Sequence, residues 1–336
     1  MDWLSALNYP VYLAIFICIY GCLALGLNVQ WGFAGLFNAG IAGFFAVGAY
    51  TSAILTSPAA EGRIGGFELS FPIGIIGAMV VTAILAWPIG KICLRFRSDY
   101  LAIVSIGFAE AIRLIARSED WLTNSSRGIS SIPRPFGDLP YAQAQWAYLG
   151  ITASILLISY LLIERQARSP WGRMMRAIRD NEKAAQAMGK DVPFRRLQAF
   201  ILGSALMGLS GALYVHLART ITPDAIDPMI ITFLAWIMVI LGGSGNNRGV
   251  LLGAFIIWVI WSSSEFVTDQ LPAEWALKAK YARIFLIGLL LQLVLRFRPE
   301  GLLPEKMRTF KKNKLDNLSN SNGEISADSN TKTVLK

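Results

Sequence analysis

A succession of apolar runs, most of them long enough to cross a bilayer, dominates this chain of 336 residues. A helix needs roughly 20 apolar residues to span the hydrocarbon core of a membrane. Such runs lie at about residues 10–28, 33–55, 72–93, 100–116, 146–163, 197–217, 229–242, 249–264 and 282–297. The seventh and eighth runs are short, so they form either two spans or one re-entrant hairpin. The sequence predicts an all-α polytopic integral membrane protein with about 8–10 transmembrane helices.

The composition agrees with this class and excludes several others. Only 16% of the residues are charged, against about 25% in an average soluble domain. The net charge of +9 comes from basic residues between the apolar runs, which is a topology pattern, so we predict no nucleic-acid partner. The three cysteines lie in or beside apolar runs, and there is a single histidine. We therefore expect no disulfide framework, no metal site and no catalytic residues.

Lysine and arginine are distributed unequally between the two sets of loops. If the N-terminus lies outside, twenty basic residues fall on the cytoplasmic side and eight on the opposite side. Basic residues favour cytoplasmic loops, so this bias places the N-terminus outside. An odd number of spans then leaves the C-terminus in the cytoplasm.

The chain divides into a transmembrane domain of residues 1–297 and a polar tail of residues 298–336. The tail becomes rich in Asn, Ser and Asp, cannot bury a core, and is expected to be disordered. The transmembrane domain is interrupted by a charged stretch at 164–196, which we call the basic loop. It holds nine Lys or Arg residues, and its charge places it on the cytoplasmic side.

The basic loop has the pattern of two short helices. Ser169 and Pro170 suit the N-cap and first turn of one helix, in which apolar residues and arginines then alternate at helical period. A second short helix follows, and Gly189 suits its C-terminal cap. Such a loop either lies on anionic lipid or binds a protein partner. Ala184 and Ala185 offer lipid little apolar area but fit a protein groove, so we favour a protein partner.

Four polar residues stand at membrane depth. Glu110 and Arg113 are three residues apart, which places them on one face of a helix. Charged groups in hydrocarbon usually face the protein interior or a wet cavity, so this pair is either a local ion pair or part of a translocation path. Asn28 and Asn38 are weaker candidates for the same path. Because the surrounding stretch is rich in glycine, its helix is expected to be irregular at residues 31–38.

Small residues recur at helical spacing in several runs. Ser204, Gly208 and Ala212 are four residues apart, and such ladders serve either close helix packing or a pathway lined by exposed backbone. The glycine-rich stretch at 242–249 lacks the GxxxxGK[ST] order of a phosphate-binding loop. We therefore interpret that stretch as a tight helix–helix turn.

The basic loop resembles the EAA loop of ATP-binding-cassette importer permeases through the spacing of Glu182, Ala184, Ala185 and Gly189. The order of motifs resembles the LivM-type permeases for branched-chain amino acids. The matching segments are GLNVQWGFAGLFNAGIAGFFAVGAYT, RSDYLAIVSIGFAEAIRLI, GISSIPRPFG, RSPWGRMMRAIRDNEKAAQAMG, AFILGSALMGLSGALY, ILGGSGNNRGVLLGA and RPEGLL. One departure is the pair at 246–247, Asn-Asn where many members have Gly-Thr, which suggests a subgroup with other neutral or polar substrates.

This resemblance implies a function and a set of partners. The chain would be the permease subunit of an importer that moves branched-chain or other neutral amino acids across a bacterial or archaeal plasma membrane. The partners would be a second, LivH-like permease, two ATPase subunits that use ATP and Mg, an extracytoplasmic substrate-binding protein and membrane lipid. This chain would bind no cofactor itself. The ATPase-coupling residues would be Arg176, Arg179, Glu182, Ala184, Ala185 and Gly189.

Alternatives stay open at this point. Permeases for urea and short amides belong to the same wider family, so the substrate is the least defined part of the hypothesis. An ion-coupled secondary amino-acid carrier would use broken helices and midplane ion ligands. The spans carry no acidic relay, and the structured basic loop also disfavours such a carrier. A scaffold or an enzyme is not supported, because the sequence has no nucleophile, base or metal constellation.

Overall fold

A computed structural model describes most of the chain. The described residues are 8–59, 62, 64–94, 98–269, 278, 282, 285–286, 288–289, 292–298 and 300–305. Of residues 98–99 and 265–269 the backbone alone is described. The contacts divide the chain into Met1–Pro304 and Glu305–Lys336, and only Glu305 of the second unit is described. The predicted tail, apart from residues 298 and 300–305, and part of the ninth predicted span therefore lie outside the described residues.

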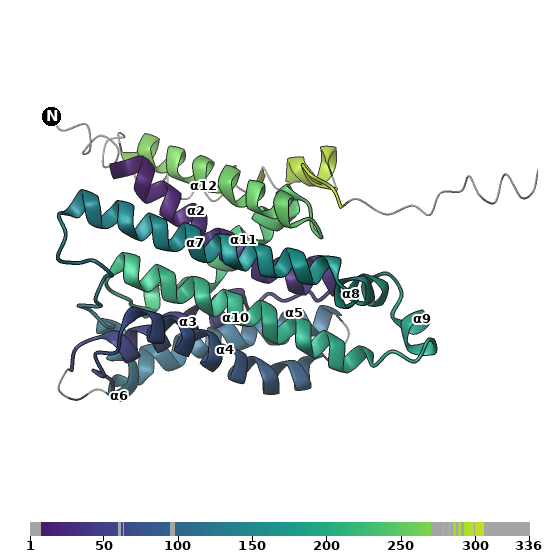
Figure 1. Cartoon of the computed structure of the whole chain (residues 1–336), viewed down its shortest axis with the longest axis horizontal. Helices are drawn as coiled ribbons and strands as arrows, with labels where there is room; N and C mark the ends of the chain where they lie inside the picture. Colours follow the sequence, from purple (N-terminus) through teal and green to yellow (C-terminus); the bar gives the residue numbers. More distant parts are fainter. Residues whose placement is uncertain are drawn as a thin grey trace, which may run out of the picture. The chain divides into compact units, whose positions relative to one another are not determined.

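The regular elements of the described residues are helices (Figure 1). They are α2 (Asn8–Leu27), the π-helix η1 (Asn28–Phe33), α3 (Ile41–Thr56), α4 (Phe71–Cys93), α5 (Ser98–Ser118), α6 (Asp120–Thr123), η2 (Ser125–Arg127), α7 (Tyr141–Arg168), α8 (Pro170–Asp180), α9 (Glu182–Ala187), α10 (Val192–Ala218), η3 (Pro223–Ala225), α11 (Pro228–Gly242) and α12 (Asn247–Asp269). Within the described part, the one β-bridge pairs Ile129 with Ile221.

The predicted class, an all-α polytopic membrane protein, is confirmed. Over the described residues, 5 helical stretches are long and apolar enough to cross a membrane, at Asn8–Phe33, Phe71–Cys93, Tyr141–Arg168, Val192–Ala218 and Pro223–Gly242. α5 and α12 have 21 and 23 residues, so each is about 30 Å long or more at 1.5 Å per residue. This length of α12 favours a second crossing over a re-entrant hairpin.

Several predicted bounds are wrong, for two physical reasons. The second apolar run begins at residue 33, but its helix α3 begins at Ile41, because the glycine-rich stretch, expected to be irregular at 31–38, leaves the helix. α7 and α10 extend beyond the predicted 146–163 and 197–217. Their polar ends continue as helix past the apolar run, so hydropathy alone does not mark where they stop.

The irregular stretch predicted at residues 31–38 is confirmed. α2 passes into the π-helix η1, and the chain then runs non-helically through residues 34–40, a segment we call the break. Gly35 has φ of +67°, a conformation that glycine adopts without strain. Most residues of the break are buried, as non-helical backbone at membrane depth must be.

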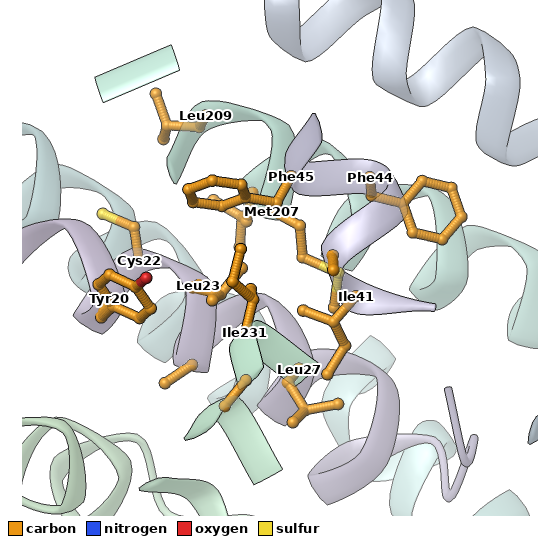
Figure 2. Close-up of a cluster of buried hydrophobic side chains, with 14 of the residues drawn as sticks. Tyr20, Cys22, Leu23, Leu27, Ile41, Phe44, Phe45, Met207, Leu209 and Ile231 are labelled. Carbon is orange, nitrogen blue, oxygen red and sulfur yellow. The ribbon is translucent and has the colours of Figure 1, made fainter. Parts of the chain in front are cut away.

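α10 lies at the centre of the helix packing and contacts α2, α3 and α4. It meets α3 backbone to backbone, since a Cβ placed on Gly48 would lie 2.1 Å from the carbonyl oxygen of Gly208. Figure 2 shows part of the buried hydrophobic cluster that these helices share, with Leu23 and Leu27 of α2, Phe44 and Phe45 of α3, and Met207 and Leu209 of α10. The close-packing interpretation of the small residues is thus confirmed for this pair of helices.

The two ends of the long helices carry different structures. α8 and α9 lie at one end, and α6 lies at the other (Figure 1). At the α6 end, His216 is fully buried and bonds Ser52 Oγ at 2.9 Å and the Pro133 carbonyl oxygen at 2.7 Å. Arg134 lies with its guanidinium 5.1 Å from the ring centre of Tyr148, and burial lowers the pKa of that guanidinium. These contacts hold the 129–134 loop against α10, through His216, and against α7, through Tyr148.

Candidate functional site

The basic loop folds as the two helices that its pattern predicts. Ser169 Oγ accepts a backbone N–H in the first turn of α8, and Asn181 Oδ1 does the same for α9 at 3.0 Å. Gly189 follows α9 with φ of +74° and donates its N–H to the carbonyl of the third residue before it, at 2.9 Å. The ends of the basic loop belong to α7 and α10. The loop is therefore an ordered structure, fixed by its own caps.

α8 is fastened to the membrane helices through one buried face. Gly172, Met175 and Ile178 are buried, three residues apart, against the end of α7 and the core. A Cβ on Gly172 would lie 2.3 Å from the carbonyl oxygen of Ala167, so the two helices touch there. Arg176 Nη2 donates to the same carbonyl at 2.9 Å. α8 is thus an anchored element, and Arg176 is one of its anchors.

Arg179 links α8 to the break in the core. Its Nη1 donates a hydrogen bond to the carbonyl oxygen of Gly32, in the π-helix. Its Nε donates to Asp180 at 3.2 Å, and its side chain also packs over Gly35, the first glycine of the break. The arginine that the sequence suggested for coupling therefore contacts the irregular segment directly.

α9 projects beyond α8 and presents most of its surface. Ala185 is the buried residue of this helix, whereas Ala184 is exposed. Met188 is 78% exposed, and a Cβ placed on Gly189 would meet no atom within 4 Å. Of the two alanines predicted to fit a partner, only Ala184 is on the accessible face; Ala185 packs inward.

Glu182 lies at the first turn of α9 and pairs with Arg196 of α10, with the two charged atoms 2.9 Å apart. The glutamate side chain is 42% exposed and that of the arginine 21%. Exposed ion pairs contribute little to stability. The pair sets the direction of α9 relative to α10 more than it stabilises the fold.

Asn28 is fully buried where α2 passes into the π-helix. Its Nδ2 donates to Asn247 Oδ1 at 2.9 Å, and its Oδ1 accepts the backbone N–H of Gly245 at 2.8 Å. Asn247 Nδ2 in turn donates to Glu164 Oε2 at 2.8 Å. Asn28 therefore joins the π-helix to the start of α12 and the end of α7. A role on a translocation path stays a prediction.

Asn38 lies in the break, and both the nitrogen and the oxygen of its side-chain amide form hydrogen bonds. It donates to Gln30 Oε1 at 2.8 Å and accepts the N–H of Gly40 at 2.8 Å. Gln30 donates to Ser204 Oγ at 3.1 Å, and the indole of Trp236 donates to the Asn38 carbonyl at 3.1 Å. The break is thus held to α10 and α11 by buried hydrogen bonds. The predicted path role of Asn38 is likewise untested.

Glu110 and Arg113 form the ion pair that their spacing predicts. Arg113 Nε lies 3.0 Å from Glu110 Oε2, and Nη2 lies 2.5 Å from Oε1. Arg113 also lies 3.9 Å from Asp224 and lines a small cavity with Ala42 and Ala46 of α3. The side chains of Arg113 and Glu110 remain 27% and 41% exposed. A local ion pair is confirmed, and participation in a path stays a prediction.

The glycine-rich stretch at 242–249 is the predicted tight turn, here between α11 and α12. The motif RPEGLL packs on it, because Leu302 and Leu303 donate backbone N–H groups to the carbonyls of Leu241 and Gly242 at 2.8 and 3.0 Å. Asn246 Nδ2 donates to the Leu303 carbonyl at 3.1 Å. Two motifs far apart in sequence therefore form one small structure.

Sequence reasoning missed Glu164, Asn247 and Gln30 as members of these buried networks. Gln30 and Asn247 are polar residues beside apolar runs, and Glu164 is an acidic residue at the end of a span. Polar side chains at such positions are buried only with hydrogen-bond partners. That signal marks the residues as candidates, but it does not say which of them meet.

An anchored α8, an exposed α9 and a buried broken helix are the distinguishing features of this multi-pass membrane protein. Residues 9–295 match the family described as branched-chain amino acid transport system, permease component. The chain belongs to this family.

Individual relatives agree with this assignment. The chain is 32% identical to the high-affinity branched-chain amino acid transport system permease protein LivM of Escherichia coli, over 88% of this chain and 70% of the relative. It is 29% identical to a probable LivM of Methanocaldococcus jannaschii, over 86% and 91%, and 22% identical to LivH of Salmonella typhimurium, over 84% and 92%. No solved structure matches the chain significantly. The LivM-type resemblance is confirmed.

Proposed function

We propose that this chain is the membrane subunit of an ATP-binding-cassette importer that moves branched-chain or other neutral amino acids into the cytoplasm. It has no catalytic residue of its own in this proposal. The observation that carries the proposal is α9, a capped helix with an exposed face, held to the membrane helices through α8. The names of the relatives, which specify branched-chain amino acid transport, support the substrate class.

The complete transporter needs partner chains for docking and energy. We infer a LivH-like permease as the second membrane subunit, since a protein of that name is similar to this chain over most of its length. Two ATPase subunits bind ATP and Mg, and each permease receives one of them at its exposed helix. The bias of Lys and Arg puts α9 in the cytoplasm, the N-terminus outside and the C-terminus inside.

Energy enters through α9 in this mechanism. ATP binding closes the ATPase pair and displaces α9. Because a single residue, Asn181, separates α8 from α9, α8 moves with α9. α8 holds the end of α7 through Arg176 and the π-helix through Arg179. The displacement therefore reaches the break at residues 34–40, the kind of broken helix around which transporters build substrate sites.

The outer face receives the substrate in this proposal. A binding protein docks on the loops at the α6 end, including residues 117–144, and supplies most of the substrate selection. Glu110 and Arg113 lie towards this end, beside Asp224. A charged pair there suits the zwitterionic head of an amino acid, so these residues, with Asn28 and Asn38, are the candidates for the path.

The test is a bulky substitution on the exposed face of α9. Ala184→Trp places an indole where the ATPase would pack. Ala153→Trp, on an exposed position of α7, is the matched control. ATP-driven uptake of radiolabelled leucine is measured in vesicles that carry the assembled transporter. We expect Ala184→Trp to lower uptake about tenfold, equivalent to ~1.4 kcal/mol of lost contact, and Ala153→Trp to leave it unchanged.

Each other outcome has a defined meaning. Equal uptake by Ala184→Trp and wild type, at equal amounts of assembled complex, would refute the coupling role of α9. Uptake that persists without ATP but collapses with the sodium gradient would favour an ion-coupled carrier. ATP-driven uptake of urea or acetamide, but not leucine, would move the substrate to short amides.

A further inference from the structure

A network of polar contacts connects the first residue of the basic loop, Glu164, to the π-helix and to the start of α12. Its centre is the Asn28 cluster, which we define as Asn28, Asn247 and Glu164. Asn28 and Asn247 are 0% and 2% exposed, and the Glu164 side chain is 24% exposed. Three different elements, η1, α12 and α7, contribute one residue each. Asn28 and Asn247 are 219 positions apart, and Asn247 and Glu164 are 83 positions apart, yet their side chains bond one another.

The side-chain amides of Asn28 and Asn247 form a chain of hydrogen bonds in which each amide both donates and accepts. Asn28 donates to Asn247 and accepts from the N–H of Gly245, while Asn247 donates to Glu164. The other carboxylate oxygen of Glu164 accepts from Arg168 at 2.8 Å. The order is directional, because each amide has one donor side and one acceptor side. A shift of one element must therefore carry the others or break a buried hydrogen bond.

The cluster is connected to α8 through one residue, Gly32. Arg179 holds the carbonyl of Gly32, and a Cβ on Gly32 would lie 2.0 Å from Asn28 Oδ1 and 2.5 Å from the Gly245 nitrogen. Gly32 is consequently pressed between the arginine contact and the cluster. The element that carries it, η1, is a π-helix, a form found mostly as short insertions at functional sites.

The cluster is also connected to the RPEGLL motif, near the C-terminal limit of the described residues. Gly245 and Asn247 belong to the turn on which Leu302 and Leu303 pack, and Asn246 bonds the carbonyl of Leu303. The start of α12 is therefore fixed on both sides, by the cluster and by the RPEGLL motif. The start of α12 and the π-helix are therefore joined as one unit through the cluster.

We infer that the Asn28 cluster is the linkage that carries a movement of α8, passed to the π-helix through Arg179, on to the start of α12, so that the π-helix, the break and the start of α12 change position together. Asn28, Asn247 and Glu164 are positioning residues in this inference, acting through the backbone at Gly32. The inference rests on the proposed function, because it assigns the path by which that function is coupled to ATP.

The test reverses one hydrogen bond and then restores it. Asn247→Asp keeps the acceptor for Asn28 but removes the donor to Glu164 and sets two carboxylates against each other. An aspartate at the first residue of α12 suits the helix dipole, so the helix itself is not weakened. Glu164→Gln alone keeps an acceptor oxygen for Asn247. The double variant Asn247→Asp/Glu164→Gln restores the bond with donor and acceptor exchanged.

The primary measurement is the number of leucine molecules taken up per ATP hydrolysed, in liposomes that contain the assembled transporter. We expect Asn247→Asp to lower this ratio about tenfold, within the usual range of coupling energies between sites. Glu164→Gln should stay within about twofold of wild type, and the double variant should recover, since its buried bond is remade. A purely structural role would lower uptake and ATP hydrolysis together, in proportion to the amount of complex, and would overturn the inference.

A second measurement follows the chain itself. Hydrogen–deuterium exchange of the complex should be faster in Asn247→Asp over both residues 28–40 and α8, and should return to wild-type rates in the double variant. Faster exchange confined to the start of α12 would overturn the inference. A wild-type transporter without ATP-driven leucine uptake would instead count against the proposed function, and the exchange data would still decide whether the elements move together.

Discussion

The contact between Gly48 of α3 and Gly208 of α10 provides a sharp test of the packing that supports the broken helix. A methyl group on Gly48 would lie 2.1 Å from the Gly208 carbonyl oxygen and 2.4 Å from its Cα, whereas ordinary contact starts at 3.4 Å. Both obstacles are backbone atoms, which cannot rotate away. Gly48→Ala therefore forces the helices apart by on the order of 1 Å in a close-packed interior.

The cost of this separation follows from the packing that it removes. A gap of 0.5–1 Å already forfeits about a quarter to a half of each dispersion contact. Overpacking by one methyl group typically costs about 1–3 kcal/mol, and the rigid neighbours here favour the upper end. An unfolding entropy of about 2.1 cal/mol/K per residue amounts to ~0.7 kcal/mol/K for 336 residues, so each kcal/mol corresponds to about 1.4 °C. At the upper end of the cost, the melting temperature should fall by roughly 3–4 °C.

The assay is thermal unfolding of the purified protein in detergent, followed by a thiol-reactive dye or by size-exclusion chromatography after heating. Gly150→Ala is the matched control, since a Cβ on Gly150 of α7 would meet no atom within 4 Å. That change should be neutral or stabilising by up to about 1 kcal/mol, because alanine has the higher helix propensity. Equal melting temperatures for Gly48→Ala and wild type would refute the backbone contact between α3 and α10.

Two further predictions concern buried hydrogen bonds. Gln30→Leu removes the acceptor of Asn38 and should destabilise the protein by about 1–3 kcal/mol, measured by the same melting assay; a melting temperature equal to that of wild type would contradict the role of the amide. His216→Phe removes the bonds to Ser52 and the Pro133 carbonyl and should cost a similar ~1–3 kcal/mol. It should also make the 129–134 loop more sensitive to limited proteolysis, and unchanged cleavage would show that the histidine does not hold that loop.

The structures that the sequence predicts well are those determined by neighbours in the chain. The caps of α8 and α9 depend on residues two or three positions away, so Ser169 and Gly189 identify them. The ion pair of Glu110 and Arg113 depends on helical spacing alone. The irregularity at 31–38 follows from local glycine content. Each of these features is therefore readable without knowledge of the tertiary fold.

The features that the sequence does not predict are contacts between distant segments. Asn28 and Asn247 are 219 positions apart, and no spacing rule joins them. The same reason accounts for α9, where only tertiary packing decides that Ala185 turns inward while Ala184 stays exposed. It also accounts for the partners of the break, since the Trp236 indole of α11 bonds the Asn38 carbonyl, and Gln30, which accepts from Asn38, bonds the Phe200 carbonyl of α10.

The departure from the family pattern at Asn246 and Asn247 is best explained by these contacts. Asn246 bonds the Leu303 carbonyl, and Asn247 is buried between Asn28 and Glu164. A side chain with both a donor and an acceptor is what that position requires, because it receives one hydrogen bond and donates another. The departure therefore bears on how the start of α12 is fixed. That it marks a subgroup with other substrates stays a prediction.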